Sequence, residues 1–212
     1  MSKPIIFISA GHYPSKPGAV FDGFVEHDEA MIWSKRLMEL LKDKAMLVPT
    51  GILQDKVGFI NARSTPGSFC VEIHFNDATK WTDKNRDGVM TDDEIAHIGE
   101  GAETLYCPGS DAGMRLAAIV QASLEDLFPY KWTDHNRNGL QEKDELTGRG
   151  IKEGWYRMNK ANGPDFILAK TKCPTVIVEP EFVQRKDRII SNREAACLHL
   201  AAALIAHQEE VA

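Results

Sequence analysis

Apolar residues along the chain fall into short unbroken runs and into stripes spaced by three or four positions. The short runs are rich in Ile, Val and Phe and are bounded by polar or glycine-containing segments, a pattern that predicts buried β-strands. The first run, PIIFISA, is followed at once by Gly11. On this pattern we expect strands at residues 4–10, 45–48, 69–75, 103–107 and 175–178.

The stripes predict amphipathic helices between these strands. From Glu26 to about Leu41, apolar residues recur at the spacing of one helix face. A second helix is expected at 111–128, with Asp111 as its N-cap and Pro129 as its stop, and a third at 192–207. Strands that alternate with helices favour an α/β fold. No linker rich in Gly, Ser or Pro divides the chain, so we expect 1–212 to form one domain, with a mostly parallel twisted sheet and helices on both faces.

The chain carries 25 basic and 31 acidic side chains, for a formal net charge of −6. This acidity argues against nucleic acid as the main partner, because binding to phosphates needs a basic surface. No apolar run reaches the roughly 18 residues of a membrane span. The first residues, MSKPIIFISAGH, lack the features of a signal peptide. We therefore expect no membrane span and no secretory leader.

Most of the net charge is concentrated in two similar segments. KWTDKNRDGVMTDDE (80–94) and KWTDHNRNGLQEKDE (131–145) are identical at nine of fifteen positions. Both match D-x-[DN]-x-[DN]-G-x5-E, the calcium loop of EF-hands, in which spaced oxygens surround the ion. The expected ligands are Asp83, Asn85, Asp87, the Val89 carbonyl and Glu94 in the first loop, and Asp134, Asn136, Asn138, the Leu140 carbonyl and Glu145 in the second.

An alternative for each loop is a set of Asx-rich turns held by their own backbone hydrogen bonds. Two full matches to the motif favour calcium. Neither loop follows a clear helix, so we expect EF-hand-type loops inserted into the α/β domain near 80–97 and 130–147. Because Asp83 lies only nine residues beyond His74, calcium in the first loop would rigidify an insertion close to the end of the strand at 69–75.

Four side chains suited to metal binding or acid–base chemistry lie where α/β enzymes place their sites, beyond the carboxyl ends of strands. His12 follows the first strand, His74 and Glu179 end two later strands, and Glu26 opens the first helix. Two imidazoles and one carboxylate are typical ligands of a catalytic zinc, and a further carboxylate can act as general base. Each residue also has a structural explanation, such as the stabilisation of a helix-opening glutamate by the helix dipole. Spacing alone leaves the zinc site open, because no compact HExxH signature is present.

Several longer segments resemble the zinc-dependent N-acetylmuramoyl-L-alanine amidases. SAGHYPSKPGAVFDGFVEHDEAMIWSKRL is similar to that family's opening, VEIHFNDA to its strand ending in H-x-N, and CPTVIVEPEF to its P-x-x-x-x-E-x-x-F stretch. The family's segment between the H-x-N strand and the P-x-x-x-x-E-x-x-F stretch is similar to GAETLYCPGSDAGMRLAAIVQASL. The resemblance implies that His12, Glu26 and His74 bind zinc and that Glu179 is the catalytic glutamate. His27 is the alternative ligand if the register is shifted by one residue.

The same resemblance implies hydrolysis of the amide between the lactyl group of N-acetylmuramic acid and L-alanine in peptidoglycan. With no signal peptide or wall-binding domain expected, the interpretation is a monomeric phage endolysin, and a shortened bacterial protein is the alternative. Such an endolysin would accumulate in the host cytoplasm and reach the cell wall through a holin pore. Two alternatives stay open: a zinc peptidase that cuts within the stem peptide, and a non-catalytic calcium-binding module.

Three further residues have open roles. Glu181 stands where many family members have glycine; it either faces the zinc site, where repulsion would raise a pKa, or points away as a surface group. Glu72 shares a strand face with His74 and is either a partner of that ring or an ordinary polar residue. Arg149 either contacts substrate carboxylates or is a solvated loop residue, and we leave it out of the site.

Overall fold

The computed structural model describes residues 3–78, 100–129, 150–155 and 159–211. Its strands are β1 (Ile6–Ala10), β2 (Val20–Phe21), β3 (Phe24–Val25), β4 (Ala45–Leu47), β5 (Phe69–Ile73), β6 (Glu103–Tyr106), β7 (Gly150–Glu153) and β8 (Thr175–Glu179). Its α-helices are α1 (Glu26–Leu41), α2 (Leu53–Arg63), α5 (Asp111–Ala122), α6 (Phe166–Lys170) and α7 (Lys186–Val211). Short 3₁₀ turns are η1 (Lys42–Lys44), η3 (Lys160–Asn162) and η4 (Val183–Arg185).

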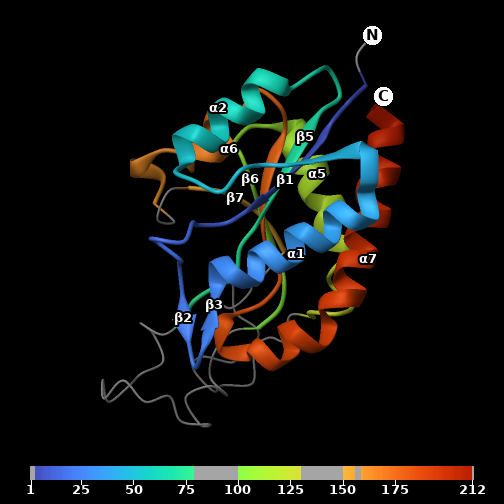
Figure 1. The fold of residues 1–212 in the computed structure, drawn as a ribbon. Helices are drawn as coiled ribbons and strands as arrows, with labels where there is room; N and C mark the ends of the chain where they lie inside the picture. The colour runs from blue at the N-terminus through green and yellow to red at the C-terminus, as the bar shows by residue number, and fades with distance from the viewer. Residues whose placement is uncertain (1–2, 79–99, 130–149, 156–158, 212) are drawn as a thin grey trace, which may run out of the picture.

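Six strands form one sheet in the order β4-β1-β5-β8-β6-β7 (Figure 1). β4, β1, β5 and β8 run parallel to one another, whereas β6 runs antiparallel to β8 and parallel to β7. Parallel neighbours need long crossover connections, which the intervening helices provide. The expected α/β domain with a mostly parallel sheet is confirmed.

Helices cover both faces of the sheet, as expected (Figure 1). α1 and α5 contact α7 on one face, and α2 contacts α6 on the other. The first face buries an apolar cluster that includes Ile8, Trp33 and Leu200. The second face buries a separate cluster around Phe7 and Ile60. β1 contributes to both clusters because successive side chains of a strand point to opposite faces.

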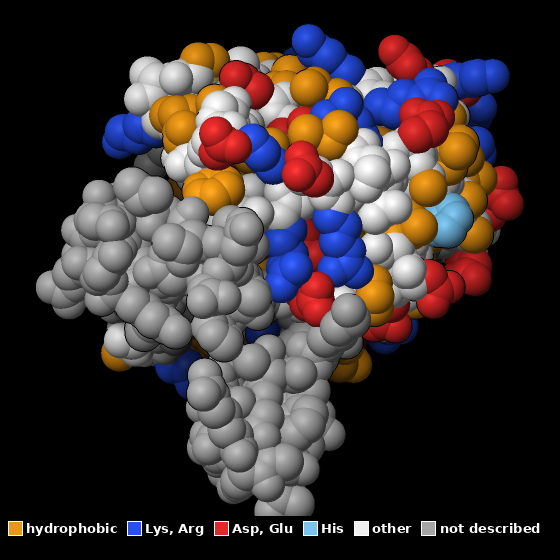
Figure 2. All heavy atoms as spheres, turned by 90° about the horizontal axis from the view of Figure 1, so that it is seen from below, with side chains coloured by type: hydrophobic (Ala, Val, Ile, Leu, Met, Phe, Trp, Pro, Cys, Tyr) orange, Lys and Arg blue, Asp and Glu red, His pale blue; other side chains and the backbone are white. Residues whose placement is uncertain are grey.

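Basic and acidic side chains lie side by side on the face of the molecule shown in Figure 2. At the start of α7, Arg188 lies 2.9 Å from Glu100 and 3.1 Å from Glu181, and its guanidinium also reaches the Leu127 carbonyl at 3.5 Å. Arg185 lies 3.4 Å from Glu100. Glu100 directly follows residues 79–99 and Leu127 shortly precedes residues 130–149, two of the segments that the structure does not describe. The start of α7 therefore holds the described chain next to each of these two segments.

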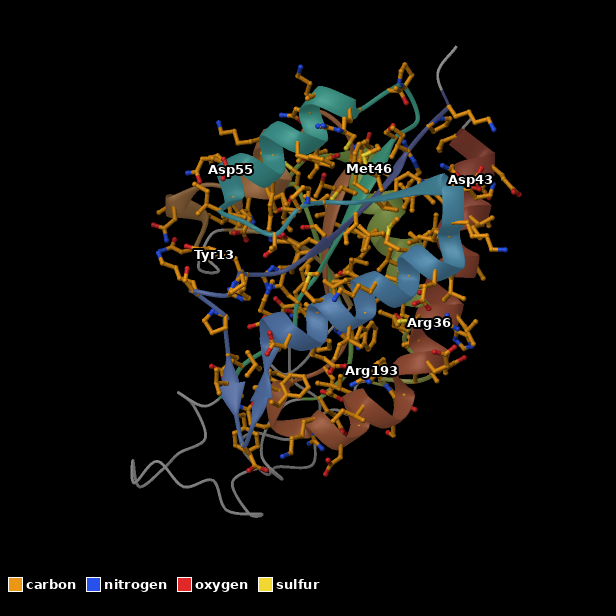
Figure 3. The ribbon with its side chains drawn as sticks, viewed as in Figure 1. Tyr13, Arg36, Asp43, Met46, Asp55 and Arg193 are labelled. Atoms are coloured by element: carbon orange, nitrogen blue, oxygen red, sulfur yellow. The ribbon has the colours of Figure 1, made fainter. Side chains whose placement is uncertain are left out.

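Ion pairs also join α1 to α7. Arg193 of α7 donates to both carboxylate oxygens of Glu29, at 2.6 and 2.7 Å, and Arg36 of α1 donates to both oxygens of Glu194, at 2.9 and 2.6 Å (Figure 3). Bidentate arginine–carboxylate pairs fix orientation as well as proximity. These two pairs hold α1, whose first residue is Glu26, against α7.

The segment Val183–Val211 is long and apolar enough to cross a membrane by length and composition alone, and 33% of its most apolar window is buried. The same segment supplies Ile189, Leu200 and Leu204 to the core cluster on the α1 face. A core helix of a folded domain passes this test as well as a membrane helix does. The expectation that the protein has no membrane span therefore stays a prediction.

Several features of the helices differ from the sequence-based expectation. α7 runs over Lys186–Val211, so it begins earlier and ends later than the expected helix at 192–207. α5 ends at Ala122 and continues as turns, and its N-cap is Ser110 rather than Asp111, because Ser110 Oγ accepts from the Gly113 N–H at 3.0 Å. The helix α2 was not expected. One of its buried positions is Lys56, which interrupts the apolar stripe that identifies a helix.

Candidate metal centre

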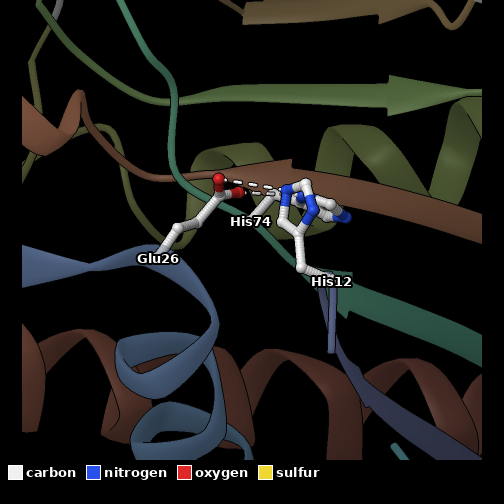
Figure 4. Close-up of side chains that lie close together, drawn as sticks. All are labelled: His12, Glu26 and His74. Carbon is white, nitrogen blue, oxygen red and sulfur yellow. Dashed lines mark hydrogen bonds and ion pairs between the residues drawn. The ribbon is translucent and has the colours of Figure 1, made fainter. Parts of the chain in front are cut away.

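Two histidines and a glutamate meet at one edge of the sheet (Figure 4). Glu26 Oε2 lies 3.0 Å from His12 Nε2, and Glu26 Oε1 lies 3.0 Å from His74 Nδ1. One possible ligand atom from each residue lies within 4.8 Å of the others. The fold thus brings together three side chains that the sequence motifs nominated separately.

The histidines meet because they follow neighbouring parallel strands. β1 pairs with β5 in a register that places Ala10 opposite Ile73, and the Gly11 N–H donates to the Ile73 carbonyl at 2.7 Å. His12 follows Ala10 by two residues, and His74 follows Ile73 directly. Carboxyl ends of parallel strands share one edge of a sheet, which is the usual location of a site in α/β proteins.

Glu26 reaches the histidines from the first residue of α1. Its carboxylate accepts hydrogen bonds from the backbone N–H groups of Ala19, at 2.9 Å, and Phe75, at 3.1 Å. The residue is only 3% exposed. With both oxygens held in this way, the carboxylate is already oriented toward the two imidazoles.

Two glycines make room for these side chains. A Cβ at Gly11 would lie 2.6 Å from the His74 ring, and a Cβ at Gly18, where φ is +81°, would overlap the Glu26 carboxylate and the His12 ring. His12 itself has a φ of 59°, in the left-handed region that non-glycine residues rarely adopt. Such backbone strain is concentrated at functional sites.

The three groups perturb one another electrostatically. Burial alone would raise the pKa of Glu26, but its hydrogen bonds with His12 and His74 outweigh burial and hold that pKa well below its usual range. Burial alone would lower the pKa of His74, but the carboxylates of Glu26 and Glu72 on either side raise it to about 10. Glu26 and His74 thus stabilise each other's charged forms, and a histidine binds a metal only through an unprotonated ring nitrogen.

Glu179, the last residue of β8, lies at the same edge of the sheet because β8 is the neighbour of β5. Its side chain lines a cavity of about 280 Å³ together with His12 and His74. The wall of this cavity also includes Tyr13, Lys16, Leu53, Lys56, Glu72, Leu105, Asp165, Ile167 and Ile177.

The donor set fits a transition-metal ion. Two imidazoles and one carboxylate leave a fourth coordination position open for water or substrate, as in catalytic zinc sites. Among the described residues, 3–78, 100–129, 150–155 and 159–211, one group of three or more His, Cys, Asp or Glu side chains lies close enough together to hold a metal ion. This group is His12, Glu26 and His74.

The family model for N-acetylmuramoyl-L-alanine amidases matches residues 6–206, which is almost the whole chain. The chain belongs to the N-acetylmuramoyl-L-alanine amidase family. The protein is thus a peptidoglycan hydrolase of the amidase type. The search of curated proteins gave no match.

Solved structures of amidases share the fold. The N-acetylmuramoyl-L-alanine amidase from Clostridium difficile aligns with a TM-score of 0.70 at 17% identity over 99% of both chains. The amidase AmiC2 of Nostoc punctiforme aligns with a TM-score of 0.69 at 18% identity over 98% of both chains. The catalytic domain of an endolysin targeting Clostridia difficile aligns with a TM-score of 0.60 at 16% identity, over 96% of this chain and 97% of that one. At these identities the likeness shows a common fold alone.

The alternative ligand, His27, lies outside the cluster of the amidase. Its Nδ1 is 2.8 Å from the Gly11 carbonyl oxygen, and the residue is 3% exposed. The start of α1 therefore presents Glu26 to the two histidines and turns His27 toward the backbone after β1.

Glu181 takes neither of the two positions considered from the sequence. It is completely buried, and its carboxylate accepts from the N–H groups of Gly101, at 3.1 Å, and Phe182, at 3.0 Å, and contacts Arg188 at 3.1 Å. Burial raises its pKa, and these contacts offset part of that effect. Glu181 is thus neither a surface group nor directed at the histidines; it ties the end of β8 to α7.

Glu72 is placed as a partner of His74. Its Oε2 lies 3.4 Å from His74 Nε2, on the side of the ring opposite Glu26. The reading of Glu72 as an ordinary polar strand residue is therefore wrong.

Both predicted calcium loops lie outside the described residues of the amidase, as does Arg149. The calcium sites and the two insertions near 80–97 and 130–147 stay predictions. The ligands concerned are Asp83, Asn85, Asp87, Val89, Glu94, Asp134, Asn136, Asn138, Leu140 and Glu145.

Proposed function

We propose that this amidase is a zinc enzyme that cleaves the amide between the lactyl group of N-acetylmuramic acid and L-alanine. His12, Glu26 and His74 would hold the zinc, and Glu179 would be the general base. The observation that carries this proposal is the convergence of the three ligands from separate elements beside one cavity that Glu179 also lines. Membership of the family supports the choice of bond.

Bound zinc would supply Lewis acidity, which polarises a carbonyl and lowers the pKa of water from ~15.7 toward ~7. Glu179 would accept the proton of the attacking water and donate it to the alanine nitrogen as the amide bond breaks. The proton lost by water thus ends on the leaving amine, and the Glu179 carboxylate is regenerated. Its place in the cavity wall beside both imidazoles supports this role.

The cavity wall supports a substrate with small apolar groups and carboxylates. Leu105, Ile167 and Ile177 form an apolar part of the wall, which suits the methyl groups of the lactyl and alanyl units. Lys16, an exposed residue of the same wall, would attract the carboxylates of the stem peptide.

The role of Glu179 is tested by Glu179→Gln, which keeps the size of the side chain and removes its basicity. We expect the variant to retain about one zinc per chain and to lose at least ~10²-fold in turnover of purified peptidoglycan. His74→Ala should lose the metal as well as the activity. Glu125→Gln, an exposed position beyond α5, is the matched control and should behave as wild type. Wild-type turnover of Glu179→Gln would rule out Glu179 as the base.

Mass analysis of digested peptidoglycan identifies the bond that is cut. Free lactyl carboxyl groups together with peptides that begin at L-alanine support the proposed amidase reaction. New ends inside the stem peptide would instead show a zinc peptidase. A protein that binds calcium but no zinc and releases no product would be a non-catalytic calcium-binding module.

We further propose that 83–94 and 134–145 each bind calcium and stabilise the enzyme. The two matches to the EF-hand loop support this proposal. Calcium added to the zinc-loaded protein should raise its melting temperature. Glu94→Gln combined with Glu145→Gln removes the twelfth-position ligand of both loops and should abolish that rise. Equal melting temperatures with and without calcium in the wild type would argue against a structural role.

We also propose that the protein serves as a monomeric phage endolysin, which is stored in the host cytoplasm and released to the cell wall through a holin pore. Membership of the amidase family supports this role, because it supplies the wall-cleaving activity that a lysin needs. Expression in host cells should cause lysis only when a holin is produced as well. Lysis without a holin would contradict the proposed route. Sedimentation of the purified protein tests the monomer.

A further inference from the structure

A buried ion pair lies next to the candidate metal centre. Lys56 of α2 and Glu72 of β5 are 2% and 1% exposed, and Lys56 Nζ donates to Glu72 Oε1 at 2.9 Å. Ser9 Oγ donates to the same oxygen at 3.0 Å, and Lys56 Nζ also donates to the Ala10 carbonyl. Burial of two charges is costly unless both are well paired. We therefore ask which function of the site this buried ion pair serves.

The second oxygen of Glu72 indicates that role. Glu72 Oε2 lies 3.4 Å from His74 Nε2, whereas His74 Nδ1 lies 3.0 Å from Glu26 Oε1. Each ring nitrogen of His74 therefore faces a different carboxylate. Nδ1 points to the side shared with Glu26 and His12, and Nε2 points away from it, toward the ion pair.

We propose that Glu72, held in place by Lys56 and Ser9, is a positioning residue that keeps the proton of His74 on Nε2 and leaves Nδ1 free to bind the metal. An ionised carboxylate can only accept a hydrogen bond, so its partner nitrogen must carry the hydrogen. Carboxylates that orient metal-binding histidines in this way also make the ring a better ligand. This inference rests on the zinc centre proposed above.

Lys56 is needed because Glu72 is completely buried. An unpaired carboxyl in this location would take up a proton and would then be able to donate to the ring instead of accepting from it. Lys56 Nζ, at 2.9 Å, and Ser9 Oγ, at 3.0 Å, both donate to Glu72 Oε1 and favour the ionised carboxylate. The charge of Lys56 also balances that of Glu72, so the carboxylate of Glu26 stays available to neutralise a bound cation.

Two double variants separate positioning from folding. Lys56→Met with Glu72→Leu removes the ion pair and the acceptor, and Lys56→Met with Glu72→Gln removes the ion pair but keeps an acceptor oxygen opposite His74. Replacing both members of a buried pair leaves no unpaired charge in the core. Zinc affinity is measured by competition with a chromophoric chelator, and the melting temperature without zinc reports the fold.

The coordinating nitrogen is read directly from the zinc-loaded wild type labelled with ¹⁵N-histidine. Long-range ¹H–¹⁵N spectra distinguish a protonated ring nitrogen from a metal-bound one, and His74→Gln assigns the signals. We expect zinc on Nδ1 and a proton on Nε2 of His74. Zinc on Nε2 would overturn the proposal whatever the variants do.

We expect the double variant with Glu72→Leu (the Leu form) to bind zinc ~10–100-fold more weakly than the wild type. The double variant with Glu72→Gln should have an intermediate zinc affinity. Equal affinities of the Leu form and the wild type would overturn the proposal. Absence of zinc binding in the wild type would overturn the metal centre itself. A wild type that binds zinc through Nδ1 but releases no lactyl carboxyl groups would support the positioning role and contradict the proposed reaction.

Discussion

At the scale of single residues, the absence of a side chain at Gly11 is as important as the presence of the ligands. The His74 ring lies where a Cβ of residue 11 would be, at a separation of 2.6 Å. The ring can move away only by leaving its contacts with Glu26 and Glu72. Glycine is therefore a requirement of the metal centre at this position.

Gly11→Ala should weaken zinc binding at least ~10-fold, because it displaces a ligand whose orientation governs metal affinity. Affinity is measured by chelator competition. Gly58→Ala is the control, since a Cβ at Gly58 meets nothing within 4 Å and lies on the exposed side of α2. That variant should keep full zinc affinity and gain about 0.5–1 kcal/mol in the free energy of unfolding. Unchanged zinc affinity in Gly11→Ala would contradict the close approach of His74.

His12, Glu26, His74 and Glu179 could be nominated from the sequence because each stands in a recognisable motif at a strand end or helix start. Lys56 could not, because a lysine four residues into a short helix gives no sign that its ammonium reaches a carboxylate on β5. Its function depends on a contact between elements, and no local pattern encodes that contact.

At the scale of elements, the start of α7 holds three parts of the chain together. Arg188 contacts Glu100, Glu181 and the Leu127 carbonyl. Glu181 is completely buried, and the charges of Arg188, which contacts it, and of Arg185 compensate it.

Arg188→Leu should lower the free energy of unfolding by about 1–3 kcal/mol at neutral pH, because it removes a charged hydrogen-bond donor from a buried carboxylate. Arg36→Leu breaks pairs with Glu194 and Glu39 at the surface and should cost about 0–1 kcal/mol. Urea titrations of both variants measure these losses. Equal losses would contradict the role given to Arg188.

The Arg188→Leu loss should also depend on pH. Burial already raises the folded-state pKa of Glu181 above its unfolded value of 4.5, and removal of Arg188 raises it further. The folded state then binds a proton more readily than the unfolded state, so stability falls as the pH rises above 4.5 and through the folded-state pKa. Urea titrations at several pH values should show a larger difference from wild type at pH 8 than at pH 5.

Elements that carry a long apolar pattern were predictable, and short or interrupted ones were not. α1 begins and ends at the expected residues, and β1, β4, β5, β6 and β8 lie within or next to the expected runs. α6, β7 and the β2–β3 hairpin have five or fewer residues per element, too few for a period to emerge. The antiparallel direction of β6 was not predictable either, because it follows from the path of the chain between elements and not from the strand itself.

At the scale of the whole molecule, the candidate metal centre links β1, α1 and β5. Glu26 is the first residue of α1, His74 lies one residue beyond β5, and His12 lies two residues beyond β1. Only the folded chain brings these ligands together. Metal binding and folding are therefore thermodynamically coupled.

Zinc at 100 times its dissociation constant should stabilise the fold by about 2.7 kcal/mol. For a chain of this size, such stabilisation corresponds to a rise in melting temperature of about 5–10 °C. Circular dichroism melts with and without zinc measure this rise. His12→Ala should show none, and a rise of the same size in that variant would place the stabilising metal elsewhere.

The order of these groups along the chain has a consequence during synthesis. His12, Glu26 and His74 all precede β6, whereas Glu179 ends β8, the last strand. A nascent polypeptide therefore leaves the ribosome with every candidate ligand well before the carboxylate proposed to draw the proton from water. A chain interrupted between these points carries every ligand but lacks β8 and α7, so the fold that brings the ligands together can form only after the proposed base has been made.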